Sequence, residues 1–235
     1  MIISHKYKFI FLEYPKTGTL SMSTVLRRHH PEINWVRFEN HKKEKARIRH
    51  SGLKDALIQH PECSNYFKFA FVRNPWDRAV SLKYHLIYSQ KYREMEFSKY
   101  IPSMHFKAQP TFYQFCEKNY ENLDFIGKYE NLEEDFKNVC NIIGLEKMKK
   151  LHHLNKRDNE EKEKRLIKSL ERRKSLTKDE KEIVNLEKKI NESRERKRIK
   201  KNIEPRDYRE YYDDETRQIV AEKYAKDIEY FNYKF

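Results

Sequence analysis

The chain of 235 residues carries a formal net charge of +14, with 37% hydrophobic and 37% charged residues. This length suits a single domain, but a mean hydropathy of -1.07 excludes a fold in which every segment lies on one compact core. The three cysteines (Cys63, Cys116 and Cys140) lie far apart without a CxxC pair, so neither a disulfide framework nor a zinc site is indicated.

The first predicted element is a strand over residues 8–14. The apolar run to which it belongs is closed by Glu13 and falls far short of the roughly 18 apolar residues of a membrane span. We therefore expect no membrane span and a cytoplasmic protein. The alternative is a lumenal domain whose membrane anchor has been removed.

A loop suited to an anion follows this strand, at residues 15–19 (PKTGT), before a helix-compatible stretch over residues 20–28. A helix N-terminus presents unpaired backbone N–H groups and a positive dipole end. Gly18 lets the backbone come close to a ligand, Lys16 adds a positive charge, and Thr17, Thr19 and Ser21 add hydroxyl donors. An ATP or GTP loop would end in Gly-Lys-Ser/Thr, whereas this lysine precedes the glycine. An ordinary turn is the remaining alternative.

A second strand is predicted over residues 66–72, followed by Arg73-Asn74-Pro75 and a helix that begins near the proline. Arg73 stands at the strand end and Ser81 comes eight residues later, so both could hold one phosphate. Arg78 either pairs with an acidic side chain as a structural residue or reaches the acceptor.

A third, weaker strand is predicted over residues 124–129, before a helix whose apolar positions (Leu132, Phe136, Val139 and Ile143) follow helical spacing. Gly144 stands where a C-terminal cap belongs. Strands that alternate with helices predict an α/β fold: a single domain with a central parallel sheet flanked by helices. Ligands of such sheets bind at the carboxyl ends of the strands, where both loops lie.

From Arg157 to Lys201 the composition changes to 18 basic and 11 acidic residues without Pro, Gly, Phe, Tyr or Trp. We interpret this stretch as a charged helical hairpin with an apolar stripe of Leu166, Ile167, Leu170, Ile183, Leu186 and Ile190. Thr177 followed by Glu180 is typical of a capping box. The predicted organisation is a domain over 1–157 and 202–235 with an insertion at 158–201.

The composition then reverts. A helix N-terminus is favoured by the acidic run Asp213, Asp214 and Glu215. A buried helix face is predicted from the apolar positions that follow, Ile219, Val220, Tyr224 and Ile228.

Together, the PKTG loop and the segment FVRNPWDRAVS (71–81) resemble the sulfotransferases that use 3′-phosphoadenosine 5′-phosphosulfate (PAPS), particularly the carbohydrate branch that includes the 2-O-sulfotransferases. The resemblance also covers KYENL (128–132) and the tail from Tyr208, but not residues 158–201, and Leu20 replaces a hydroxyl residue of many relatives. It implies a P-loop NTPase-like sulfotransferase fold. It also implies a donor site made of Lys16, Thr17, Gly18, Thr19, Arg73 and Ser81, in which the first loop binds the 5′-phosphosulfate and Arg73 and Ser81 bind the 3′-phosphate. The hydroxyl of Ser21 is a further predicted donor contact.

Sulfuryl transfer to a hydroxyl needs a base for the acceptor proton and positive charge on the leaving phosphate. Lys16 is the natural electrophile, and His50 stands where glycan-sulfating relatives place a catalytic histidine. His41 is the reserve, with Glu39 and Asp55 behind it, and Lys156 is a weaker donor contact. We expect no metal.

The acceptor implied by the resemblance is a carbohydrate hydroxyl, and a tyrosine or a small phenol is the alternative. A nucleic-acid-binding protein that uses the basic hairpin is an alternative of another class. The absence of aromatic side chains from the hairpin argues against it, because stacking on bases needs aromatic platforms. A kinase on a related fold is disfavoured by the order of Lys16 and Gly18.

Overall fold

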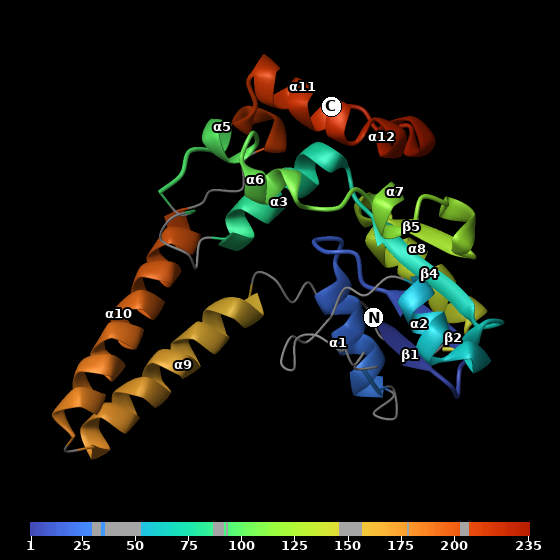
Figure 1. The fold of residues 1–235 in the computed structure, drawn as a ribbon. Coiled ribbons are helices and arrows are strands. Elements are labelled where there is room, and N and C mark those ends of the chain that lie inside the picture. Colours follow the sequence, from blue (N-terminus) through green and yellow to red (C-terminus); the bar gives the residue numbers. More distant parts are fainter. Residues whose placement is uncertain are drawn as a thin grey trace.

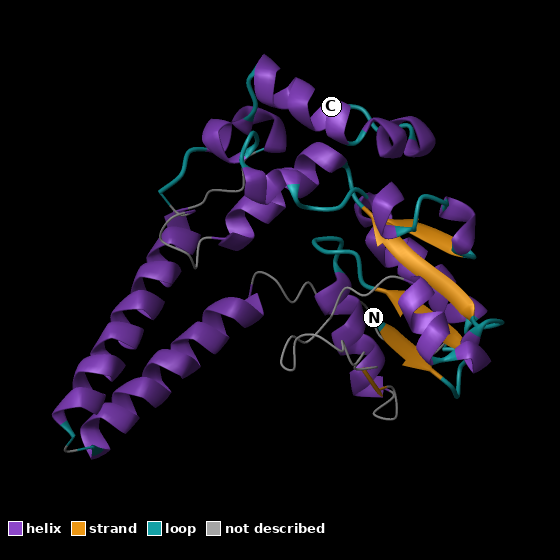
Figure 2. Ribbon diagram, in the orientation of Figure 1, coloured by secondary structure: helices purple, strands orange, loops and turns teal. Residues whose placement is uncertain are grey.

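The computed structural model describes residues 1–29, 34–35, 53–86, 92, 94–145, 157–177, 179–202 and 207–235. Its strands are β1 (Ile2–Ser4), β2 (Phe9–Leu12), β3 (Asn34–Trp35), β4 (Phe67–Val72) and β5 (Phe125–Lys128). The helices of the body are α1 (Thr19–His29), α2 (Leu53–Gln59), α3 (Pro75–His85), α5 (Phe97–Tyr100), α6 (Met104–Lys107), α7 (Phe112–Phe115), α8 (Leu132–Ile142), α11 (Asp214–Lys223) and α12 (Ala225–Phe231). Two longer helices, α9 (Arg157–Leu176) and α10 (Glu180–Asn202), project from the body (Figures 1 and 2).

The strands form one sheet in the order β3-β1-β2-β4-β5. β2, β4 and β5 are parallel, as the alternation of strands and helices predicts, but β1 is antiparallel to both of its neighbours. The strand predicted over residues 8–14 is β2, and the additional strand β1 pairs with it across a turn at residues 5–8, in which Lys8 has a φ of 51°. The prediction of a parallel sheet was right for β2, β4 and β5 and wrong for β1, because a four-residue turn of mixed polarity reverses the chain between β1 and β2.

Both faces of the sheet are buried. Alternate side chains of β2 separate onto the two faces: Phe9 and Phe11 join a cluster with α1 and α8, and Ile10 and Leu12 join one with α2 and α7. A third cluster, built around Trp76, lies between α3 and the C-terminal helix α11. The result is a layered α/β body in which β2 and the carboxyl end of β4 are buried on both faces.

Local signals explain several helix ends. Pro75 begins α3, and the Asn74 side chain accepts hydrogen bonds from the amides of Trp76 and Asp77. Asp213 forms a capping box with Thr216 at the start of α11, as the acidic run there predicts. The capping box predicted at Thr177 is wrong, because the Asp179 carboxylate accepts from the amides of Lys181 and Glu182 instead. Asp179 directly precedes the first residue of α10, whereas Thr177 lies two residues further back.

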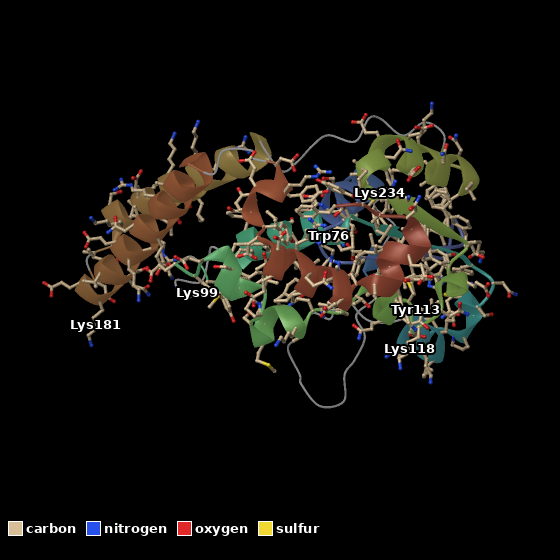
Figure 3. All side chains as sticks on the ribbon, turned by 90° about the horizontal axis from the view of Figure 1, so that it is seen from above. Trp76, Lys99, Tyr113, Lys118, Lys181 and Lys234 are labelled. Carbon is tan, nitrogen blue, oxygen red and sulfur yellow. The ribbon has the colours of Figure 1, made fainter. Side chains whose placement is uncertain are left out.

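The two projecting helices pack against each other as an antiparallel pair, which we call the hairpin. Leu186 and Ile190 are buried along its seam, whereas Leu166 is 46% exposed and was wrongly assigned to the stripe. Ion pairs cross the seam from Arg173 to Glu182, Lys174 to Glu187 and Arg194 to Glu171. Figure 3 shows Lys181 at the far end of the hairpin, remote from Trp76 in the body. None of the three core clusters contains a described hairpin residue.

Candidate active site

Two loops meet at the carboxyl ends of β2 and β4, which are parallel neighbours. The phosphate-loop candidate, residues 15–18, connects β2 to α1, and Arg73 follows β4 directly. The Nη1 of Arg73 donates a hydrogen bond to the carbonyl oxygen of Lys16 at 3.1 Å. The structure thus brings together two residues that are 57 positions apart and that the sequence assigns to one site.

Arg73 is held by three groups at once. Its Nε and Nη2 donate to the two carboxylate oxygens of Asp77 at 2.7 and 2.8 Å, and its guanidinium lies 4.1 Å from the centroid of the Tyr129 ring. With the bond to Lys16, three of its five N–H hydrogens have acceptors among the described residues, and the other two could bind a ligand. Sequence reasoning missed Asp77 and Tyr129; the i,i+4 spacing of Arg73 and Asp77 was the available signal.

Lys16 is a half-buried cation in an unusual backbone conformation. Its φ of 72° is in the left-handed region, which costs a non-glycine residue about 1–2 kcal/mol. Burial, followed by the charges of Arg73 and Arg78, lowers the pKa of Lys16 to about 8. Within the part of the chain that the structure describes, no carboxylate pairs with its ammonium group. A cation so placed is stabilised by a bound anion.

Arg78 is a buried residue that contacts the phosphate loop at Pro15. It is 1% exposed, its Nε donates to the carbonyl oxygen of Pro15 at 3.0 Å, and its Nη1 donates to Tyr224 Oη at 2.9 Å. Its guanidinium also lies 4.0 Å from the centroid of the Tyr14 ring. Of the two roles weighed for Arg78, the structure shows the structural one, with tyrosines and a carbonyl as partners in place of an acid.

Gly18 positions the loop against the start of α8. Its φ is +78°, and a Cβ built on it would lie 2.7 Å from Leu132 Cδ2. The next residues begin α1, and no acceptor contacts the backbone amides of residues 17–20 among the described residues. Four free amides, one close-packed glycine and Lys16 together form a site that fits an oxyanion.

The hydroxyl groups differ in what they can offer. Thr17 is fully buried and its Oγ1 donates to the carbonyl oxygen of Tyr14 at 2.8 Å, so its amide, not its hydroxyl, faces a ligand. Thr19 and Ser21 are buried and make no side-chain hydrogen bond to any described residue. Ser81 is half-buried on α3, and no described contact joins it to Arg73.

A family model described as the sulfotransferase family matches residues 1–234. The chain belongs to the sulfotransferase family. It is also similar to an uncharacterized protein of Archaeoglobus fulgidus, with 37% identity over 83 residues, which are 34% of this chain and 69% of that protein. No solved structure matches it. Membership supports sulfuryl transfer as the general reaction of the protein.

Several predicted residues of this sulfotransferase lie outside the described residues: Glu39, His41, His50 and Lys156. Asp55 lies in α2. Among the described histidines, His85 lies at the end of α3. Burial, followed by the positive charge of Lys16, lowers the pKa of His85 below its ordinary value. His85 was not selected from the sequence, because nothing in its neighbourhood along the chain marks it. No helix in the described parts of this sulfotransferase is long and apolar enough to cross a bilayer.

Proposed function

We propose that the protein transfers a sulfuryl group from PAPS to a carbohydrate hydroxyl. The observation that carries this proposal is the arrangement of Lys16, which has no acid partner among the described residues, beside Arg73 at the N-terminus of α1. Two separate cationic groups on adjoining loops fit a donor with two phosphates at different positions. An ATP loop needs only one such cluster, at the helix N-terminus.

The 5′-phosphosulfate would be held by the amides of residues 17–20, Lys16 and the hydroxyls of Thr19 and Ser21. The 3′-phosphate would be held by the remaining N–H groups of Arg73, with Ser81 and Lys156 as further contacts. Asp77 and Tyr129 keep the guanidinium plane in place, which reduces the side-chain entropy that binding must overcome. This division assigns one loop to the reacting end of the donor and the other to recognition.

In the reaction a base removes the proton of the acceptor hydroxyl as its oxygen attacks the sulfur, and the bond from sulfur to the bridging phosphate oxygen breaks. PAPS supplies the sulfuryl group and leaves as adenosine 3′,5′-bisphosphate. Lys16 stabilises the negative charge that develops on the leaving oxygen. The loops align acceptor, sulfur and leaving oxygen, which is the main part of catalysis in such group transfers. No residue of this mechanism needs a metal.

A thermal-shift experiment tests the donor. Adenosine 3′,5′-bisphosphate should raise the melting temperature of the protein, and ATP with magnesium should raise it less. Arg73→Ala should weaken nucleotide binding about 10- to 100-fold, the loss expected for a charged hydrogen-bonded pair. Arg209→Ala is the matched control, because Arg209 is exposed and its described side-chain contacts are the exposed Asp207 and the ring of Tyr208. The absence of any shift with the bisphosphate or PAPS overturns the proposal.

A second experiment tests the base and the acceptor together. Labelled PAPS is incubated with a panel of glycans and phenols, and we expect label to appear on a glycan. His50→Ala should retain nucleotide binding and lose transfer, because the base acts only on the acceptor. His85→Ala is the comparison, because burial, followed by the charge of Lys16, lowers the pKa of His85. Loss of transfer in that variant alone would place the base at His85, and label on phenols alone would replace the carbohydrate acceptor.

A further inference from the structure

A cluster of metal-ligand side chains lies at the opposite end of the sheet from the two loops. His5 stands in the turn between β1 and β2, and Glu62 and Cys63 belong to the turn of 3-10 helix η1 (Pro61–Cys63), which precedes β4. One ligand atom from each of these three residues lies within 4.8 Å of the other two. The four residues of β2 separate this cluster from the phosphate loop by about 13 Å, so the two sites are distinct.

The spacing of the donor atoms is close to that around a tetrahedral ion. Zinc bonds of about 2.3 Å to sulfur and 2.0 Å to nitrogen place two such ligands about 3.5 Å apart. Cys63 Sγ and His5 Nδ1 are 3.9 Å apart, although no bond other than a weak hydrogen bond joins them. A small movement of the exposed His5 ring brings the pair to the spacing that an ion needs.

The supporting contacts have the pattern of an outer ligand shell. His60 Nδ1 lies 3.2 Å from Glu62 Oε1 and orients that carboxylate. Tyr66 Oη lies 3.0 Å from His5 Nδ1 and 3.2 Å from Lys8 Nζ, so it can release the histidine nitrogen and keep Lys8 as its partner. Cys63 is fully buried beneath the exposed His5 and Glu62, and the ion would therefore sit at the surface above a fixed sulfur.

Charge balance favours a divalent ion. A Cys63 thiolate and a Glu62 carboxylate supply two negative charges, and the ammonium group of Lys8 beyond Tyr66 opposes them only partly. Mixed sulfur, nitrogen and oxygen donors are typical ligands of zinc and exclude calcium and magnesium, which bind oxygen alone.

We propose that His5, Glu62 and Cys63 form a zinc-type metal site, with His60 as the outer partner of Glu62 and water in the fourth position. The ion ties the β1–β2 turn to the segment that leads into β4, and so joins two parts of the sheet that are 58 positions apart in the chain. The sequence pattern does not indicate this site because one ligand comes from a distant turn and no pair of cysteines is involved.

Cobalt titration tests this proposal directly. Metal-free protein titrated with Co²⁺ should develop a thiolate-to-cobalt charge-transfer band in the near ultraviolet at one ion per chain, and Zn²⁺ should abolish it. His5→Ala and Glu62→Gln should weaken cobalt binding at least about tenfold, because each removes a ligand. Both residues are exposed, so the two variants should fold. Zn²⁺ should raise the melting temperature of the wild type, and less so that of the variants.

Cys63→Ser should remove the charge-transfer band. Cys140→Ser is the matched control, because Cys140 is equally buried but lies in α8 on the other face of the sheet. His105→Ala controls for the loss of a histidine elsewhere. The proposal is overturned if wild-type protein shows no band, if the band persists in Cys63→Ser, or if His5→Ala and Glu62→Gln bind cobalt as tightly as the wild type.

Discussion

Lys16 combines a charge that a donor phosphate needs with surroundings that disfavour this charge. Burial and the neighbouring Arg73 and Arg78 lower its pKa from 10.5 to about 8 in the free protein. A bound phosphate favours the charged form and raises that pKa. Above pH 8, binding must therefore include uptake of a proton, and the affinity for adenosine 3′,5′-bisphosphate should fall by up to about tenfold per pH unit. Calorimetric titrations between about pH 7 and 9.5 measure this slope.

Lys16→Arg is the control for this pH dependence, because an arginine remains charged throughout the range. It should bind the nucleotide with an affinity that does not change between pH 8 and 9.5. An equal slope in both proteins would assign the effect to another group. The same lowered pKa makes the free wild-type protein more stable as the pH rises from about 8 toward 10.5, since the unfolded chain holds this proton more tightly.

Arg78 connects the phosphate loop to the C-terminal helices. Its forked guanidinium group allows it to donate hydrogen bonds to both at once. Arg78→Lys retains the charge but cannot reach both the Pro15 carbonyl and the Tyr224 hydroxyl from one plane. We expect the free energy of unfolding to fall by about 2 kcal/mol or more, as a buried partner is left unpaired. Urea unfolding measures the change. Arg209→Lys, at an exposed ion pair, should change stability by less than about 0.5 kcal/mol.

At the scale of elements, the phosphate loop depends on its packing against α8. Gly18→Ala adds strain at a φ of +78° and pushes a Cβ into Leu132, whereas Gly144→Ala adds similar strain at a φ of +75° with nothing within 4 Å. Both should destabilise the protein by about 1 kcal/mol. Only Gly18→Ala should weaken binding of the bisphosphate, by about tenfold, because only that loop must shift. Nucleotide titrations of the two variants measure this difference. If both variants bound the bisphosphate with equal affinity, the assignment of Gly18 to the nucleotide-binding loop would be contradicted.

The sequence predicts the elements that local signals specify. Apolar runs identify β2, β4 and β5, and Pro75 and Asp213 identify the starts of α3 and α11. The antiparallel β1 could not be separated from β2, because the turn at residues 5–8 contains neither glycine nor proline and depends on Lys8 in a left-handed conformation. Short helices such as α5 and α7 have little periodicity of their own and depend on tertiary contacts, α5 with α3 and α7 with α12.

The candidate site could be predicted from the sequence only in part. The meeting of Lys16 and Arg73 follows from two loops at the ends of parallel strands. The Asp77 contact of Arg73 was open to prediction from its i,i+4 spacing. The use of the Thr17 hydroxyl inside the loop and the stacking of Arg73 on Tyr129 depend on side-chain orientation that a linear pattern does not contain. The donor roles of these residues, and His50 as the base, stay predictions.

At the scale of the whole molecule, the body and the hairpin are stabilised by different interactions. The body buries three clusters of aromatic and aliphatic side chains, whereas the hairpin has a narrow seam around Leu186 and Ile190 and exposed ion pairs. Exposed ion pairs contribute little stability each. The region 157–201, with 18 basic and 11 acidic residues, also carries half of the net charge of +14. The hairpin therefore adds positive charge to the molecule without adding to its core.

Replacing residues 158–201 by a short flexible linker should accordingly leave the body folded. We expect the melting temperature to change by no more than about 4 °C, since no described core residue is removed. Binding of adenosine 3′,5′-bisphosphate should be retained at about 0.15 M salt, where charges more than about 8 Å from the ligand are largely screened. Differential scanning fluorimetry with and without the nucleotide measures both quantities. Loss of nucleotide binding in a deletion protein that still melts cooperatively would show that the hairpin contributes residues to the donor site. Normal binding with loss of transfer to glycans would place its positive charge on the acceptor side of the reaction.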